Sequence, residues 1–229
     1  MMSTADDFPR RIMTAARDLA DRFHQRWLTE NPFSASMYGI PGYDDLMPDE
    51  SEEGERAWRS EVEGFLTEAD AIDPEPLTPA DVVTLDCTRE MATQELTMID
   101  MARAEYTVTA MQYAGPAVLM AVAARTVLLD AAAAEAYLIR LRRSGAWLDQ
   151  TGERLRAGAR KGRLPVAPLI EEAITWAEAV LAGPVPEPLL APQPPPGWAR
   201  EAAWEDERRR VAAEVVKPEI GRASCRERV

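Results

Sequence analysis

The sequence predicts an all-α protein, a multi-helix bundle, and two observations support this fold class. Apolar residues recur at spacings of three and four along most of the 229 residues, and helix-capping or helix-breaking residues separate the periodic segments. Strand-like alternation is confined to the short stretch YTVT at residues 106–109, which we interpret as part of an extended connection. A hydrophobic content of 46% and a charged content of 28% are typical of a globular protein that can bury a core.

The N-terminal half is expected to hold three long helices. The first covers residues 8–30 and ends at Asn31-Pro32, because a residue before proline disfavours the helical region. Residues 33–38 can form one or two helical turns before Gly39, Pro41 and Gly42 force a loop. The second long helix begins near Ser51 and its apolar face runs to residue 72.

The third long helix begins with a strong local signal. Thr78 is a natural N-cap, Pro79 suits the first helical position, and Asp81 lies where a capping-box acid would lie. Its apolar periodicity indicates a helix that runs past Met101.

The second half is predicted to hold more helices, the first of them central to the core. An apolar helix is expected from Gly115-Pro116 through Leu129, followed by one helix over residues 131–143 and another from about residue 144 to Gly162. Residues 166–182 give an amphipathic helix.

The segment 183–197 holds seven prolines in fifteen residues. We interpret it as a stiff surface loop within the domain, in preference to a ligand for a proline-binding module. A last, strongly charged helix follows over about 198–217, with a thin apolar stripe and few expected partners. Its arginines at 208–210 are interpreted as a solvated, ion-paired face.

The chain ends in a segment of a different kind. After Pro218 no helical stripe or strand alternation is recognised, and the residues IGRASCRERV at 220–229 are basic. They can be a flexible tail, but all ten match the translation of a common sequencing adapter. We therefore expect a non-native tail at 220–229 and a partial helical domain at 1–218.

Charge and hydropathy exclude several classes of partner. A formal net charge of −13 argues against binding to nucleic acid or to anionic membranes, both of which need clustered Lys and Arg. The sequence has no uninterrupted apolar stretch long enough for a transmembrane helix, and its first residues lack a secretory pattern. We expect a cytoplasmic protein.

The residues that could carry chemistry are few, and no catalytic or metal-binding residue is predicted in this chain. His24 is the single histidine and is expected at the surface of its helix. Cys87 is expected to be a buried or half-buried structural thiol. The acids at 44, 45, 49, 50, 52 and 53 lack calcium-loop spacing, so turn formation and helix N-terminal charge explain them better.

Several segments, in order, resemble the N-terminal part of the bacterial domain-of-unknown-function 885 family over residues 8–218. The segment NPFSASMYGIPGYDDLMPD is similar to a family segment that this chain matches at Pro32, Gly39, Tyr43, Asp44 and Leu46. LTPADVVTLDCTREMATQEL is similar to the family's third helix. AAAAEAYLIRLRRSGAWLDQTGERLRAGARKGRLPVAPLIEEAI is similar to its later Ala-Tyr-Leu and Arg-Leu-x-x-Gly segments.

The resemblance implies a larger, mostly helical protein of zinc-peptidase type, with a His-Glu-x-x-Pro-Gly-His element in a C-terminal part that this chain lacks. It implies that these N-terminal helices wall a substrate channel and that the chain alone is catalytically inert, with zinc held by the missing half. The partners are then that C-terminal half and a peptide substrate. Tyr43 and Asp44 are candidates to line the substrate groove, although a structural turn explains them better.

Two alternatives stay open. The chain can be a self-contained helical interaction module without enzymatic activity, which predicts a capped C-terminal helix and a closed core. It can also be an unstable piece that associates through an apolar face left uncovered.

Overall fold

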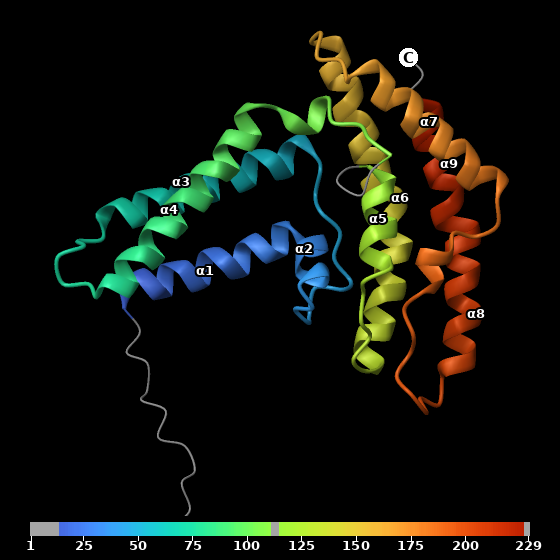
Figure 1. Cartoon of the computed structure of the whole chain (residues 1–229), viewed down its shortest axis with the longest axis horizontal. Helices are drawn as coiled ribbons and strands as arrows, with labels where there is room; N and C mark the ends of the chain where they lie inside the picture. The colour runs from blue at the N-terminus through green and yellow to red at the C-terminus, as the bar shows by residue number, and fades with distance from the viewer. Residues whose placement is uncertain (1–13, 111–114, 227–229) are drawn as a thin grey trace, which may run out of the picture.

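The computed structural model describes residues 14–110 and 115–226, and every regular element in these residues is helical (Figure 1). The prediction of an all-α multi-helix protein is thereby confirmed. Helices α1, α3 and α4 lie together on one side of the molecule and are called the arm below. Helices α5 to α9 lie on the other side and are called the body.

The arm consists of α1 (Ala15–Glu30), α3 (Glu52–Ala71) and α4 (Pro79–Asp100), close to the predicted bounds. Each helix begins at a side-chain cap. Thr14 accepts from Arg17 N at 3.3 Å, Ser51 from Gly54 N at 3.0 Å, and Thr78 from Asp81 N at 3.2 Å. The part of the first predicted helix that precedes Thr14 lies outside the described residues.

Two small apolar clusters hold the arm together. One joins Phe23, Trp58, Val62 and Ala92, and the other joins Ala16, Leu19, Ala69 and Leu85. These residues come from the predicted stripes of the three helices, so the periodicity identified the arm's core correctly.

A short helix and a loop connect α1 to α3. Helix α2 (Pro32–Met37) follows α1 directly, with Asn31 between them. Gly39 and Gly42 have φ angles of 71° and 93°, a region that only glycine enters without strain, and they turn the chain back. The predicted helical turns and glycine loop are thus confirmed.

The body is organised around α6 (Ala131–Arg160), a single helix of 30 residues. The prediction of two separate helices, 131–143 and 144 to Gly162, was wrong, because the chain stays helical through this point. Gly145, next to the predicted boundary, marks a close approach of two helices. A Cβ atom on Gly145 would lie 3.1 Å from Cγ of Glu219, so the missing side chain lets the C-terminal helix pack against α6.

Helix α5 (Pro116–Ala123) is shorter than predicted. Its residues are buried as expected, but Val127 and Leu129 are 65% and 67% exposed in the segment that follows. The helix ends at Ala123, and the chain then leads to Asp130, whose carboxylate accepts from Ala133 N at 2.8 Å and caps α6. Between arm and body lies η1 (Arg103–Glu105), a short 3-10 helix.

Helix α7 (Ala167–Ala182) agrees with the prediction, but the proline-rich segment after it is a surface loop only in part. It contains the short 3-10 helix η2 (Glu187–Leu190), and Leu189 is fully buried in the body's core. The hydroxyl of Tyr137 donates to the Leu189 carbonyl at 3.0 Å, and the Arg208 guanidinium donates to the Pro192 carbonyl. Proline lacks an N–H, so the segment has few backbone donors of its own, and these two side chains satisfy carbonyls inside the body.

The C-terminal helices are well packed, contrary to the expectation of few partners. Helix α8 (Glu201–Val211), the π-helical turn η3 (Ala212–Val216) and α9 (Lys217–Arg226) run on without a break. Trp204, Val216 and Ile220 are fully buried in the body's core. Arg208 is buried against the Trp204 ring, so it is not part of a solvated face.

The helix continues past Pro218, where no helical pattern was recognised in the sequence. Proline lacks the N–H that would close an α-helical turn and its ring crowds the carbonyl four residues earlier. The wider turn η3 immediately precedes Pro218 and accommodates this defect. The adapter origin of residues 220–229 is a separate matter and stays a prediction.

Candidate functional site

The guanidinium of Arg140 connects the body to the segment that carries the family resemblance. Arg140 lies on α6 and is fully buried. It donates from Nε to the Leu46 carbonyl at 3.0 Å and from Nη2 to the carbonyls of Tyr43 at 2.5 Å and Pro32 at 3.5 Å. Its planar guanidinium has several donors and therefore fixes a loop that lies outside the regular helices.

A hydroxyl links Arg140 to Asp44. Arg140 Nη1 donates to Ser36 Oγ at 2.8 Å, and Ser36 Oγ donates to Asp44 Oδ1 at 2.7 Å. The direct distance from Arg140 Nη1 to Asp44 Oδ1 is 3.9 Å, so the serine mediates the charge pair. Burial lowers the pKa of Arg140 to about 10, with Asp44 acting against the shift, so the guanidinium remains protonated at neutral pH.

The residues singled out in the sequence thus meet at one point. Pro32, Tyr43, Asp44 and Leu46 surround Arg140 directly or through Ser36, and Gly39 provides the turn among them. Tyr43 and Asp44 do not line the large cavity described next. Their role in a substrate groove stays a prediction, and the contacts in the structure are those of an anchored turn.

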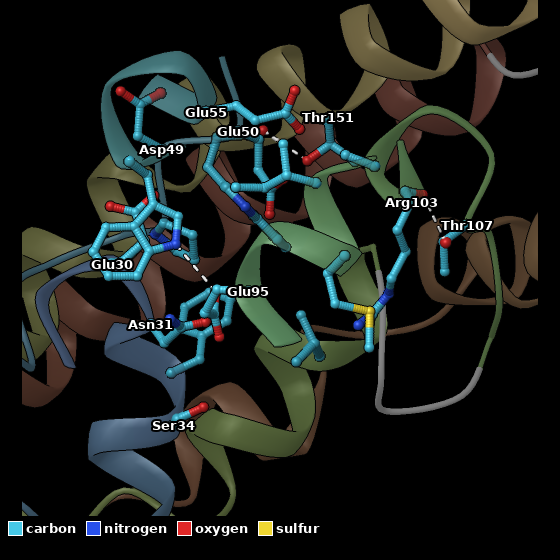
Figure 2. A pocket seen from close by; sticks show the side chains of 18 of the residues that line it. Glu30, Asn31, Ser34, Asp49, Glu50, Glu55, Glu95, Arg103, Thr107 and Thr151 are labelled. Atoms are coloured by element: carbon cyan, nitrogen blue, oxygen red, sulfur yellow. Dashed lines mark hydrogen bonds between the residues drawn. The ribbon is translucent and has the colours of Figure 1, made fainter. Parts of the chain in front are cut away.

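A cavity of about 450 Å³ opens where the arm meets the body (Figure 2). Its volume is within the range of small-molecule sites. It is lined by residues from both helix groups and from the connections between them: Glu30, Asn31, Phe33, Ser34, Pro48, Asp49, Glu50, Glu55, Trp58, Glu95, Met98, Ile99, Arg103, Ala104, Thr107, Gly115, Val118, Trp147 and Thr151. The lining has five carboxylates and one guanidinium, so the cavity is acidic.

Two of the five carboxylates already have cationic partners. Arg26 Nη1 lies 3.1 Å from Glu30, and Arg154 Nη2 lies 2.6 Å from Glu55. Burial nevertheless raises the pKa of Glu30, against the lowering effect of Arg26, because the carboxylate has lost much of its hydration.

Glu95 is held by neutral donors. The indole N–H groups of Trp27 and Trp58 donate to its two oxygens at 2.7 and 3.1 Å. Both tryptophans belong to the arm, so the arm's packing fixes the orientation of this carboxylate. Among the described residues Glu95 has no ion pair, and its charge is not neutralised.

Asp49 is placed by its own loop and by α6. Its Oδ1 accepts from Ser51 N and from Gln150 Nε2, each at 3.0 Å. Gly54 leaves space for it, since a Cβ there would lie 2.6 Å from Asp49 Cγ. Two of the six clustered acids in the sequence, Asp49 and Glu50, therefore reach the cavity, while turn formation explains their spacing as predicted.

Glu50 and Trp147 are neighbours in the lining. Burial raises the pKa of Glu50, against the attraction of Arg154, and the Trp147 indole is near enough to lower it slightly. The Trp147 side chain is only 3% exposed, yet its Nε1 has no acceptor in hydrogen-bond geometry. A buried N–H without a partner is unfavourable, so a water or a ligand with an acceptor would be stabilised beside it.

Sequence reasoning missed Glu95, Glu55 and Trp147. Each lies on a long helix where a charged or aromatic residue is ordinary, and their convergence depends on how arm and body meet. His24 is exposed on α1 as predicted, but Cys87 is also exposed and the prediction of a buried thiol was wrong.

Within residues 14–110 and 115–226, no three carboxylate, imidazole or thiol groups come together as a metal site. In the same residues, no helix is both long and apolar enough to cross a membrane. The expectation of zinc in another part of the protein stays a prediction.

Comparison with known proteins gives a family but no activity. None of the curated proteins matches the chain. Among solved structures, the "putative lipoprotein from Colwellia psychrerythraea" is similar with a TM-score of 0.70 at 16% identity, which shows the fold alone. The similarity covers 94% of this chain and 41% of that one, so the chain spans less than half of its structural neighbour. The model of a bacterial family of unknown function, DUF885, matches residues 32–224, and the chain therefore belongs to the DUF885 family.

Proposed function

We propose that this chain is the N-terminal helical part of a metal-dependent peptidase or related hydrolase and that it forms one wall of the substrate channel. The observation that carries the proposal is the acidic cavity between arm and body. It offers carboxylates, indoles and an apolar wall for binding, and its volume suits a small ligand.

The chemistry of hydrolysis indicates which groups this chain supplies and which the rest of the protein supplies. Metal-assisted hydrolysis needs about three protein ligands and a general base at an open coordination position. The described residues provide binding groups at the cavity but no such set. On this proposal, the ligands and the base come from the rest of the protein, and zinc activates water there. The chain alone is catalytically inert.

A test compares the chain with the longer protein encoded by its source gene. We expect the longer protein to hydrolyse a mixture of fluorogenic peptides, to lose this activity in a chelator, and to regain it with zinc. The 229-residue chain should show no hydrolysis. Activity that persists in the chelator, or hydrolysis by the short chain, would contradict the proposal.

A second candidate is a self-contained helical interaction module. The observation that favours it is the C-terminal helix pair, whose Trp204 and Ile220 are buried in a closed core. A cooperative, monomeric thermal transition for the 229-residue chain would favour this candidate. A helical but poorly cooperative species would favour the fragment of a larger enzyme. The cytoplasmic location is likewise a proposal, and cell fractionation tests it.

A further inference from the structure

The charge of the cavity is not balanced by its own residues. Glu30 and Glu55 are paired with arginines, which leaves Asp49, Glu50 and Glu95 against Arg103. In Figure 2, Arg103 lies beside Thr107, on the other side of the cavity from Glu30 and Asp49. A surplus of negative charge in a partly desolvated space attracts a cation, because the interaction is stronger there than in water.

Glu95 is the best-ordered acceptor for such a cation. Its two oxygens are fixed by the indoles of Trp27 and Trp58, which donate hydrogen bonds without cancelling its charge. A carboxylate held in this way keeps lone pairs for further donors and needs little reorganisation when they arrive. An ammonium group supplies three donors on one compact charge.

Trp147 adds a second requirement, for a hydrogen-bond acceptor on the ligand in addition to its positive charge. Its buried Nε1–H belongs to a residue that lines the same cavity, and it lies near the Glu50 carboxylate but has no acceptor in hydrogen-bond geometry. A fitting ligand therefore also carries a hydrogen-bond acceptor. A bare metal ion has none, and no metal-binding group of residues occurs in the described part of the chain. The amino terminus of a peptide has an ammonium three bonds away from a carbonyl oxygen and so meets both needs.

We infer that the cavity between arm and body binds the free amino terminus of a peptide, with the ammonium at Glu95 and its acidic neighbours and the first carbonyl at Trp147. The inference concerns binding by this chain and holds whether or not the longer protein is a hydrolase. A lysine side chain shares the ammonium chemistry but has no adjacent carbonyl, so it fits less well.

The test is isothermal titration calorimetry of the 229-residue chain with three probes. Ala-Ala-amide carries both groups, Nα-acetyl-Ala-Ala-amide lacks the ammonium, and Nα-acetyl-lysine methylamide carries an ammonium far from its carbonyls. We expect Ala-Ala-amide to bind, the acetylated peptide not to bind, and the lysine probe to bind at least about tenfold more weakly. Equal binding of the free and acetylated peptides would overturn the inference, and so would no binding of Ala-Ala-amide. Equal binding of the lysine probe would overturn the assignment to an amino terminus.

Variants locate the site. Glu95→Gln should weaken binding of Ala-Ala-amide by about tenfold or more, because it removes a charge-assisted hydrogen bond. Glu90→Gln, at an exposed position of the same helix, is the matched control and should leave affinity unchanged. Trp147→Phe keeps an aromatic ring but removes the N–H, and should weaken Ala-Ala-amide while leaving the lysine probe unaffected.

Circular dichroism establishes that each variant is folded before titration. Should Glu95→Gln unfold, Trp147→Phe and Glu50→Gln still decide the matter. Unchanged affinity in these folded variants would place the ligand elsewhere. Because no turnover is measured, failure here is distinct from failure of the proposed hydrolase activity, which is tested on the longer protein.

Discussion

The arm and the body contain similar helices but are stabilised in different ways. In the arm, side-chain caps start each helix, the core is divided into two small clusters, and charged side chains pair at the surface. Arg26, for example, bonds Glu61 on the next helix at 2.5 Å. The body has one large cluster, and two buried arginines and a tryptophan of its helices donate to carbonyls of other segments.

This comparison shows where surface ion pairs are sufficient and where buried hydrogen-bond donors are needed. Helices that form from local signals need little from distant segments, so surface pairs of modest strength are enough between them. The body instead holds irregular, proline-rich and loop segments, whose carbonyls need buried donors. Arg140 meets this need at the junction with the arm, and the cavity lies near the same junction.

The largest effect is expected at Arg140. Arg140→Ala removes the side-chain donor to the carbonyls of Tyr43 and Leu46 and leaves the buried Asp44 charge without its cationic partner. It should lower the free energy of unfolding by about 4 kcal/mol. Arg143→Ala is the control, because Arg143 lies three residues further along, is exposed and pairs with Asp45. It should lower the free energy of unfolding by less than about 1 kcal/mol. Urea unfolding followed by circular dichroism measures both. Equal effects would mean that the buried arginine does not hold arm and body together.

A second prediction concerns the body's core at its C-terminal end. Ile220 is fully buried in the large cluster, so Ile220→Ala should reduce the free energy of unfolding by about 3 kcal/mol. Arg222→Ala, exposed on the same helix, should have little effect. An Ile220→Ala protein as stable as the parent in thermal unfolding would show that α9 does not contribute to the core.

A smaller effect tests the local signals of the arm. Ser51→Ala removes the cap on α3 and should destabilise the protein by about 1 kcal/mol. Ser60→Ala, exposed within the same helix, should be neutral or slightly stabilising because alanine has the higher helix propensity. If both substitutions behave alike in thermal unfolding, the cap does not determine where the helix begins.

The smallest expected effect is a gain in the free energy of unfolding, in contrast to the losses above, and it depends on pH. Burial raises the folded-state pKa of Glu50, so the folded state binds more protons than the unfolded state between the ordinary and the raised pKa. Stability is therefore lost as pH rises through this window. Glu50→Gln avoids the loss and should be more stable than the parent above the window, with the gain vanishing below the ordinary pKa of glutamate.

Urea unfolding at several pH values measures this difference, and Glu53→Gln at an exposed position is the control. A gain that grows toward acid pH would have the wrong sign. It would mean that Glu50 is stabilised in its charged form in the folded protein.

The arm was the more predictable region because its evidence is local. Thr78, Pro79 and Asp81 lie within four residues and predict the start of α4. The apolar periodicity of α1 and α3 likewise predicts which face of each helix is buried. Errors concentrate in the body. A helix boundary was placed between residues 143 and 144, Arg208 was interpreted as a solvated charge, and the whole of 183–197 as a surface loop.

The candidate site shows the same division. The motif segment at residues 32–46 was recognised in the sequence, but nothing local points to Arg140, which lies nearly a hundred residues away from Tyr43 and Leu46. Asp49 and Glu50 were identified as an acidic cluster, but Glu95 and Trp147 were not connected with them.

The sequence by itself determined that the chain is helical, where the arm's helices begin and which of their faces are buried, because hydrogen bonds and periodicity within a helix involve neighbours three and four residues apart. Only the tertiary structure decided which arginines are buried, how the proline-rich segment and α9 join the core, and which carboxylates share a cavity. These outcomes depend on donors and acceptors that meet across long stretches of chain, and the burial that gives them their energy exists only after the helices have packed.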